Sequence, residues 1–308
     1  MLHGGFEGGA IGGAQGRARK AMFQRRHCSP GESDVEGSCL DDDIVIQVAK
    51  ALNKMCKGKK KKKLYEIDLN RSPEDIHGDV CENIKQISKC SSEACWQTIK
   101  SLMKELGSDK ERFKDSFKPL MPKKWIKDYN EWLSTYEIED CLEQHTEDDK
   151  FYFYGAVPID FKKCSVSNLC SFNLKKHIKN NKSKIGIVFN TDPSDKDGQH
   201  WISMYIDIDG INLSGQPGIY YFDSFGKEPS HEIKELVHKV KSQGNKCNKD
   251  FRYFYNDIPF QKKNNQCGMF SIHFIKKMLE GLSFVEYLKT PLSDKVMIDL
   301  RDEYFVKL

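Results

Sequence analysis

Residues 260 to 274 read FQKKNNQCGMFSIHF, a polar loop that runs into an apolar segment through a cysteine and a glycine. Phe270, Phe274 and Leu282 follow at the spacing of one helix face, so we expect a helix that opens near Cys267. Three roles are open for this cysteine: a small core residue, a metal ligand or a nucleophile. Because the chain holds 11 cysteines, composition alone does not choose among them.

The composition is hydrophilic, yet it allows a real core. Of 308 residues, 38% are apolar and 31% are charged, and the formal net charge of +4 does not by itself indicate a nucleic-acid partner. One large domain or two smaller ones fit this length. Neither a membrane-spanning stretch nor an apolar secretory signal is visible. The odd number and irregular spacing of the cysteines predict mostly free thiols in a reducing, intracellular environment.

Three regions follow one another along the chain. Residues 1–37 are glycine-rich and basic, which predicts a disordered leader. Residues 38–110 predict a helical N-terminal arm, with Ser72 before Pro73 as a helix start and a further helix beginning near residues 91–92. The lysine-rich stretch Lys57–Lys63 is expected to be a solvated loop, and a nucleic-acid or nuclear-import contact is the minority interpretation.

Residues 111–308 predict an α+β catalytic domain with a central mixed β-sheet flanked by helices. The strands are expected within FYFYGAVPIDF (151–161), KIGIVFN (184–190), HWISMYIDID (200–209), GIYYFDSF (218–225) and DFRYFYNDI (250–258). The segment around Trp132 and residues 231–243 are expected to be helical.

The second and third of the central runs predict a β-hairpin. If these strands pair about a loop centred near residue 212 or 213, Asp223 lies opposite residues 200 to 203. His200 and Asp223 then meet at one end of the hairpin, where a carboxylate can orient an imidazole and stabilise its charged form. Taken singly, each is more often a structural residue at a strand end.

Cys267 changes that balance. A helix N-terminus and a neighbouring imidazolium both favour the thiolate form of a cysteine. Gly268 allows a substrate carbonyl to approach the backbone closely, and Gln261 offers an amide donor to an oxyanion. The set of His200, Asp223, Gln261 and Cys267 therefore supplies base, orienting carboxylate, oxyanion donor and nucleophile.

The order His-Trp, then an aspartate ending the next strand, then Q-x5-C-G resembles the superfamily of ubiquitin-like-protein proteases and adenovirus proteases. NEWLSTYEI resembles the W-L-x-D-x-x-I segment that opens their catalytic domain. The resemblance implies a papain-like or adenain-like core, with Trp132 and Trp201 flanking a narrow tunnel for a Gly-Gly tail. Asp207 and Asp209 remain fallback candidates for the carboxylate.

Within that superfamily, residues 38–308 are most similar to the polyprotein proteases of large DNA viruses of the African swine fever virus type. The similarity implies a cysteine endopeptidase without a cofactor that cleaves after Gly-Gly in structural polyprotein or capsid precursors during virion maturation. It would act in the host cytoplasm, at virus assembly sites, and in the virion. One alternative is a deubiquitinase or SUMO-like isopeptidase that acts on host ubiquitin-like proteins. Others are an acyltransferase, or a non-catalytic module that binds capsid or ubiquitin-like proteins.

Two further hypotheses are weaker. Gly4-Gly5-Phe6 and two similar sequences in the leader could be sites of self-trimming, although a plain disordered leader is the favoured interpretation. No metal site is expected, because the pairs Cys90/Cys95, Cys141/His145 and Cys164/Cys170 do not combine into a four-ligand zinc pattern.

Overall fold

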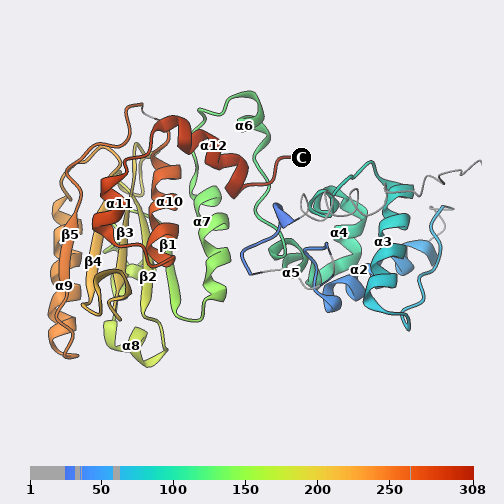
Figure 1. The fold of residues 1–308 in the computed structure, drawn as a ribbon, viewed down its shortest axis with the longest axis horizontal. Helices are drawn as coiled ribbons and strands as arrows, with labels where there is room; N and C mark the ends of the chain where they lie inside the picture. The colour runs from blue at the N-terminus through green and yellow to red at the C-terminus, as the bar shows by residue number, and fades with distance from the viewer. Residues whose placement is uncertain (1–24, 32–34, 36, 58–62, 264) are drawn as a thin grey trace, which may run out of the picture. The chain divides into compact units, whose positions relative to one another are not determined.

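The computed structural model describes residues 25–31, 35, 37–57, 63–263 and 265–308 (Figure 1). The chain divides into two compact units, one that runs to Leu120 and includes Leu308, and one from Met121 to Lys307. The sequence placed the start of the catalytic domain at residue 111. Most of the expected leader and most of the Lys57–Lys63 run lie outside the described residues.

The first unit is helical, as predicted for the arm. Its elements are α2 (Asp42–Lys57), α3 (Pro73–Ile87), η1 (Ala94–Thr98), α4 (Lys100–Leu106), η2 (Gly107–Asp109) and α5 (Lys110–Asp115). Ser72 caps α3, since its side chain accepts a hydrogen bond of 3.2 Å from the N–H of Asp75, and Pro73 occupies the first turn. The helix expected from residues 91–92 is instead a short 3₁₀ turn at η1, followed by α4.

The second unit contains a five-stranded sheet in the order β1-β2-β3-β4-β5. Its strands are β1 (Phe151–Pro158), β2 (Lys184–Asn190), β3 (Trp201–Asp207), β4 (Gly218–Phe222) and β5 (Arg252–Tyr255). The three central strands are antiparallel, whereas β1 pairs with β2 and β5 with β4 in parallel. The predicted α+β fold with a mixed sheet is therefore confirmed.

Helices cover both faces of this sheet (Figure 1). Ile202, Met204 and Ile206 of β3 belong to a core cluster with apolar residues of α8 and α9, whereas Trp201 and Tyr205 belong to a second cluster with α7, α10, α11 and α12. The helices and 3₁₀ turns of this unit are α6 (Lys123–Lys127), α7 (Thr135–Glu143), η3 (Gln144–Glu147), η4 (Asn168–Ser171), α8 (Leu174–Lys179), η5 (Ile211–Leu213), α9 (His231–Asn245), α10 (Cys267–Leu279), α11 (Phe284–Lys289) and α12 (Asp294–Tyr304). Alternate residues of β3 thus point to opposite faces of the sheet and pack into two separate hydrophobic clusters.

Two helix predictions need correction. Trp132 is not helical, because α7 begins only at Thr135, where Ser134 and Glu137 form a capping box. Leu282 does not continue the apolar face of α10, which ends at Leu279. Gly281 follows with φ +84°, a left-handed conformation that ends a helix.

The prediction of mostly free thiols is wrong for three pairs of cysteines. Disulfides join Cys28 to Cys39, Cys90 to Cys95, and Cys164 to Cys170. Each pair is close in sequence, and the fold brings the two Cα atoms to between 5.1 and 5.5 Å, a separation that a disulfide requires. The free cysteines of the described residues are Cys56, Cys81, Cys141, Cys247 and Cys267.

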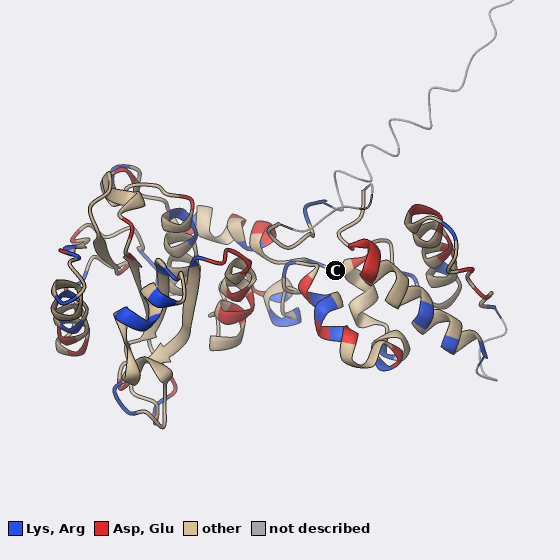
Figure 2. Ribbon diagram, turned by 90° about the horizontal axis from the view of Figure 1, so that it is seen from below, with Lys and Arg blue, Asp and Glu red and all other residues tan. Residues whose placement is uncertain are grey.

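Charged residues of both signs are interspersed over the helices of the described part of the chain (Figure 2). Among the described residues, no helix combines the length and apolar character needed to cross a bilayer.

Candidate active site

The hairpin of β3 and β4 brings His200 and Asp223 together, as its register predicted. Ser203 pairs with Phe222, the residue before Asp223. His200 Nε2 and Asp223 Oδ1 lie 2.7 Å apart, and both residues are buried. Because the carboxylate holds Nε2, Nδ1 is the ring nitrogen left to face a thiol.

Asp207 and Asp209, the fallback candidates for the carboxylate, do not contact His200. Asp207 lies at the opposite end of β3 and accepts hydrogen bonds of 2.8 Å from the N–H groups of Gly210 and Asn212, which shape the loop to β4. Asn212 in turn donates from its side chain to the carbonyls of Met278 and Leu282. Asp209 is exposed. Neither aspartate is the partner of His200.

His200 carries a positive charge near neutral pH. Burial opposes that charge, but hydrogen bonds to Asp223 and to Cys267 raise the pKa of His200 to about 9. Cys267 is buried at the first position of α10, where the unpaired backbone N–H groups of the helix point outward.

A buried asparagine that sequence reasoning missed fixes the position of Asp223. The side chain of Asn256 accepts from the N–H of Asp223 at 2.8 Å and donates to its carbonyl at 2.7 Å. The carboxylate also accepts from the N–H of Phe225. The sequence places Asn256 directly after β5, where an asparagine is typical of an ordinary turn.

Gln261 is held by the same turn. Its backbone N–H and that of Phe260 both donate to the carbonyl of Ser224 at 2.8 Å, while Ser224 Oγ donates to Gln261 Oε1 at 2.6 Å. The amide nitrogen of Gln261 donates to the carbonyl of Lys263. One of its two N–H groups is therefore engaged, and the other is the donor that an oxyanion could use.

The two tryptophans differ in burial. Trp201 is buried, and its indole N–H donates to the carbonyl of Leu133 at 2.9 Å, whereas Trp132 is 40% exposed. A Cβ at Gly268 would lie 2.9 Å from Leu133 Cβ and 3.4 Å from Trp201 Cδ1. The absence of a side chain at Gly268 thus lets α10 pack against Leu133, the neighbour of Trp132, and against Trp201 of β3, in addition to the close substrate approach that the sequence suggested.

Comparisons with known proteins identify the family of this chain. Residues 168–308 match the C-terminal catalytic domain of the Ulp1 protease family. A protein of Acanthamoeba polyphaga mimivirus that is named as a thiol protease is 31% identical over 300 residues, which cover 90% of this chain and 92% of the relative. The chain belongs to the Ulp1 protease family. It is accordingly a cysteine protease.

Two comparisons with African swine fever virus extend the likeness to the arm. A protein of the Kenya isolate named as a SUMO-1 cysteine protease is 24% identical over 239 residues, covering 72% of this chain and 85% of the relative. A crystal structure of the protease of this virus superposes with a TM-score of 0.64 at 20% identity and covers 92% of this chain and 96% of that one. This second likeness shows the fold.

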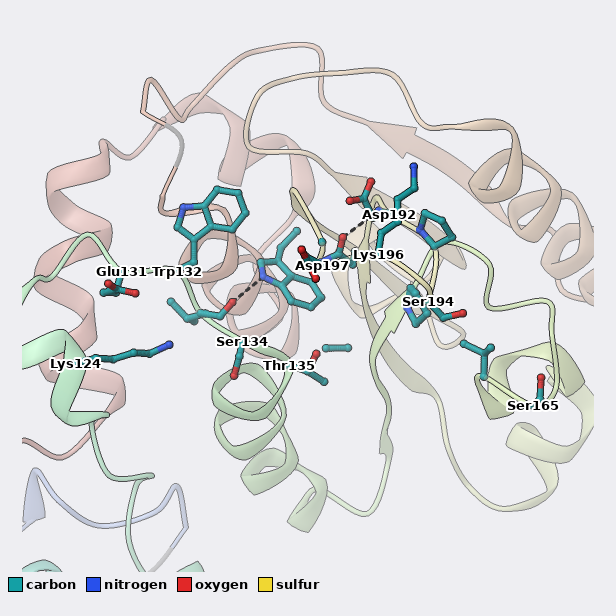
Figure 3. Close-up of a pocket in the computed structure, with 18 residues that line it drawn as sticks. Lys124, Glu131, Trp132, Ser134, Thr135, Ser165, Asp192, Ser194, Lys196 and Asp197 are labelled. Atoms are coloured by element: carbon teal, nitrogen blue, oxygen red, sulfur yellow. Dashed lines mark hydrogen bonds between the residues drawn. The ribbon is translucent and has the colours of Figure 1, made fainter.

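Two pockets of this Ulp1-family protease meet at Trp132. The first has a volume of about 710 Å³ and includes Trp201 and Leu133 in its lining, and the second, of about 470 Å³, includes His200 and Asp223. Figure 3 shows that charged groups of both signs surround the first pocket, contributed by Lys124, Glu131, Asp192, Lys196 and Asp197. Trp132 is thus a lining residue of both pockets.

A buried arginine that the sequence analysis did not single out links the C-terminal helix to this site. Arg301 of α12 is fully buried and donates to the carbonyl of Glu131 at 2.6 Å and to Oε1 of Gln266 at 3.1 Å. Its guanidinium lies 4.3 Å from the ring centre of Trp125. Because Glu131 precedes Trp132 and Gln266 precedes Cys267, one side chain braces both the tryptophan segment and the start of α10.

No group of three or more His, Cys, Asp or Glu side chains is placed to hold a metal ion among the described residues.

Proposed function

We propose that this protease hydrolyses peptide bonds after Gly-Gly with Cys267 as nucleophile and His200 as base. The observation that carries the proposal is the buried His200–Asp223 pair of 2.7 Å, in a site where interaction with Cys267 also raises the pKa of His200. Nucleophile, base and orienting carboxylate are the parts that covalent acyl transfer needs.

The reaction follows from these positions. Cys267 and His200 form a thiolate–imidazolium pair, in which His200 already holds the proton of Cys267, and the thiolate attacks the carbonyl carbon of the second glycine. The resulting oxyanion accepts hydrogen bonds from the Gln261 side chain and the backbone N–H of Cys267. The tetrahedral intermediate collapses, and His200 gives its proton to the departing amine. Water then adds to the thioester, with His200 as base, and releases the acid and the thiol.

Selectivity for glycine has a steric reason. The resemblance to the family implies that the substrate chain reaches Cys267 between Trp132 and Trp201, and the hydrogen bond from Trp201 to Leu133 holds one of these two walls in place. Glycine at two successive positions fits between two such walls because it has no side chain. The segment before Gly-Gly then lies in the pocket of about 710 Å³ and meets groups of both charges.

The viral relatives support a structural polyprotein or capsid precursor as the substrate, processed in the cytoplasm of an infected cell during particle assembly. One relative is named as a SUMO-1 cysteine protease. Folded ubiquitin-like precursors are therefore the alternative substrate class, to be tested against the polyprotein.

The experiment compares peptides containing Gly-Gly-Xaa with folded ubiquitin-like precursors, using wild type, Cys267→Ala and His200→Ala. Cys247→Ala is the matched control, because Cys247 is a free, partly exposed thiol of the same unit. We expect peptide cleavage that is lost in both active-site variants and kept in the control. Cleavage of folded precursors alone would reject the polyprotein assignment, and turnover that persists without Cys267 would reject the nucleophile.

A further inference from the structure

A second thiol, imidazole and carboxylate meet in the N-terminal unit, remote in sequence from Cys267. His77 and Cys81 are four residues apart on α3 and therefore share one face of the helix. Cys81 Sγ lies 3.8 Å from His77 Nε2 and 4.0 Å from Nδ1. Glu93 Oε1 lies 2.5 Å from His77 Nε2.

Glu93 is a fixed and buried acceptor. It is 1% exposed, and Ser38 Oγ donates to its Oε1 at 2.6 Å while the N–H of Cys39 donates to its Oε2 at 2.9 Å. Cys39 is itself held by a disulfide, and Glu93 lies within the short loop that the Cys90–Cys95 disulfide closes. A carboxylate buried in this way needs a cation, and His77 is the cation that it contacts.

The charge on His77 has the same origin as that on His200. Burial opposes it, while hydrogen bonds to Cys81 and Glu93 raise the pKa of His77 to about 10. Cys81 therefore faces an imidazolium at neutral pH, a positive charge that attracts the negative charge of an attacking sulfur.

This cluster is not a second hydrolytic site. Glu93 occupies Nε2 at 2.5 Å, the same nitrogen that lies nearest to the thiol. His77 is already protonated, its Nε2–H is held by the carboxylate, and the sulfur lies almost equally far from both ring nitrogens, so His77 acts on Cys81 as a fixed positive charge. A thiolate that is partly exposed and lacks a free base suits thiol–disulfide exchange, which needs only the nucleophile and access to it.

The other free thiol described in this unit has the opposite environment. Cys56 is also partly exposed, but its Sγ–H donates to the carbonyl of Leu64 at 3.2 Å instead of facing an imidazolium. Since the unit also contains two disulfides, thiol oxidation is part of its chemistry. Cys56 is therefore an internal control for Cys81: both thiols are free and partly exposed, but only Cys81 faces a histidine.

We propose that Cys81 is a modification site that forms mixed disulfides with small disulfides of the glutathione type. The Cys81 thiolate attacks one sulfur of the small disulfide, so that a new S–S bond forms and the original S–S bond breaks. The second sulfur leaves as a thiolate and takes a proton from solvent. Cys81 is thereby oxidised, and the departing half of the small disulfide is reduced.

The test uses full-length Cys267→Ala protein, incubated with glutathione disulfide at pH 7 and analysed by peptide mapping and mass spectrometry. We expect the mixed disulfide to form at Cys81 at least about ten times faster than at Cys56. In His77→Gln the rate at Cys81 is expected to fall by about the same factor, with no change at Cys56.

Equal rates at the two thiols in the otherwise unchanged protein would overturn the proposal. So would an unchanged rate at Cys81 in a folded His77→Gln variant, with folding checked by thermal melting. Glu93 loses its cation in His77→Gln, so that variant can fail to fold for this reason alone. In that case the comparison of Cys81 with Cys56 in the protein that keeps His77 decides the proposal.

Discussion

Replacing Gly268 by alanine tests whether the packing of α10 against the tryptophan segment controls substrate turnover. The new Cβ would lie 2.9 Å from Leu133 Cβ and 3.3 Å from Leu133 Cδ2. Ordinary carbon contacts begin near 3.4 Å, so Leu133 has to move by about half an ångström. Overpacking of this kind costs about 1–3 kcal/mol, and the better helix propensity of alanine returns up to about 1 kcal/mol.

The net expectation is a loss of about 1–2 kcal/mol in the free energy of unfolding, which lowers the melting temperature by a few degrees. The effect on catalysis should be larger, because Leu133 accepts the indole hydrogen bond of Trp201 and precedes Ser134 in the lining of the larger pocket. We expect kcat/KM for a Gly-Gly peptide to fall about tenfold or more, since small displacements of positioning groups are costly.

The assay combines peptide kinetics with the rate of alkylation of Cys267 by iodoacetamide, which reports the thiolate and should change less than threefold or so. Gly78→Ala is the control, because Gly78 is also helical but a Cβ there meets nothing within 4 Å. That variant should gain up to about 1 kcal/mol of stability and keep full activity. Wild-type turnover in Gly268→Ala would refute the coupling between this packing contact and catalysis.

Three further predictions concern neighbouring residues. Trp132→Ala should raise KM with a change in stability below about 1 kcal/mol because its indole is 40% exposed, whereas Trp201→Ala should cost about 3–5 kcal/mol; similar melting of the two variants would contradict this. The pKa of His200 is raised above its ordinary 6.5 to about 9. The positive charge of His200 therefore contributes fully to the free energy of unfolding below pH 6.5, and this contribution is lost as the pH rises through 9. The alkaline limb of kcat/KM should therefore lie near pH 9 and move to lower pH in Asp223→Asn; an unmoved limb would show that Asp223 does not tune His200. Arg301→Met should lower the free energy of unfolding by about 2–4 kcal/mol in urea denaturation, because two acceptors lose their donor, and stability equal to wild type would contradict that bracing role.

The hairpin and the start of α10 were predictable because their signals are local. Alternation along β3, the turn residues before β4 and the apolar spacing after Cys267 define elements whose pairing follows from register alone. The position of His200 opposite Asp223 follows from that register.

The supporting groups were not predictable, because their partners are distant in sequence. Arg301 meets Gln266 and Glu131 only in the folded chain, and an arginine in a charged C-terminal segment is typical of a solvated helix face. Asn256 looks like a turn residue until its contact with Asp223 is seen. Trp132 fell within an apparently helical pattern that the capping box at Ser134 interrupts.

The hairpin has one further consequence, for protein engineering. Its catalytic end is set by the pairing of β3 with β4, whereas its far end is fastened separately through Asp207 and Asn212. Beyond these contacts lies Gly215, which is exposed and where an added Cβ would meet nothing within 4 Å. A circular permutant that opens the chain at Gly215, or a reporter domain inserted there, should leave the strand register and the peptidase intact.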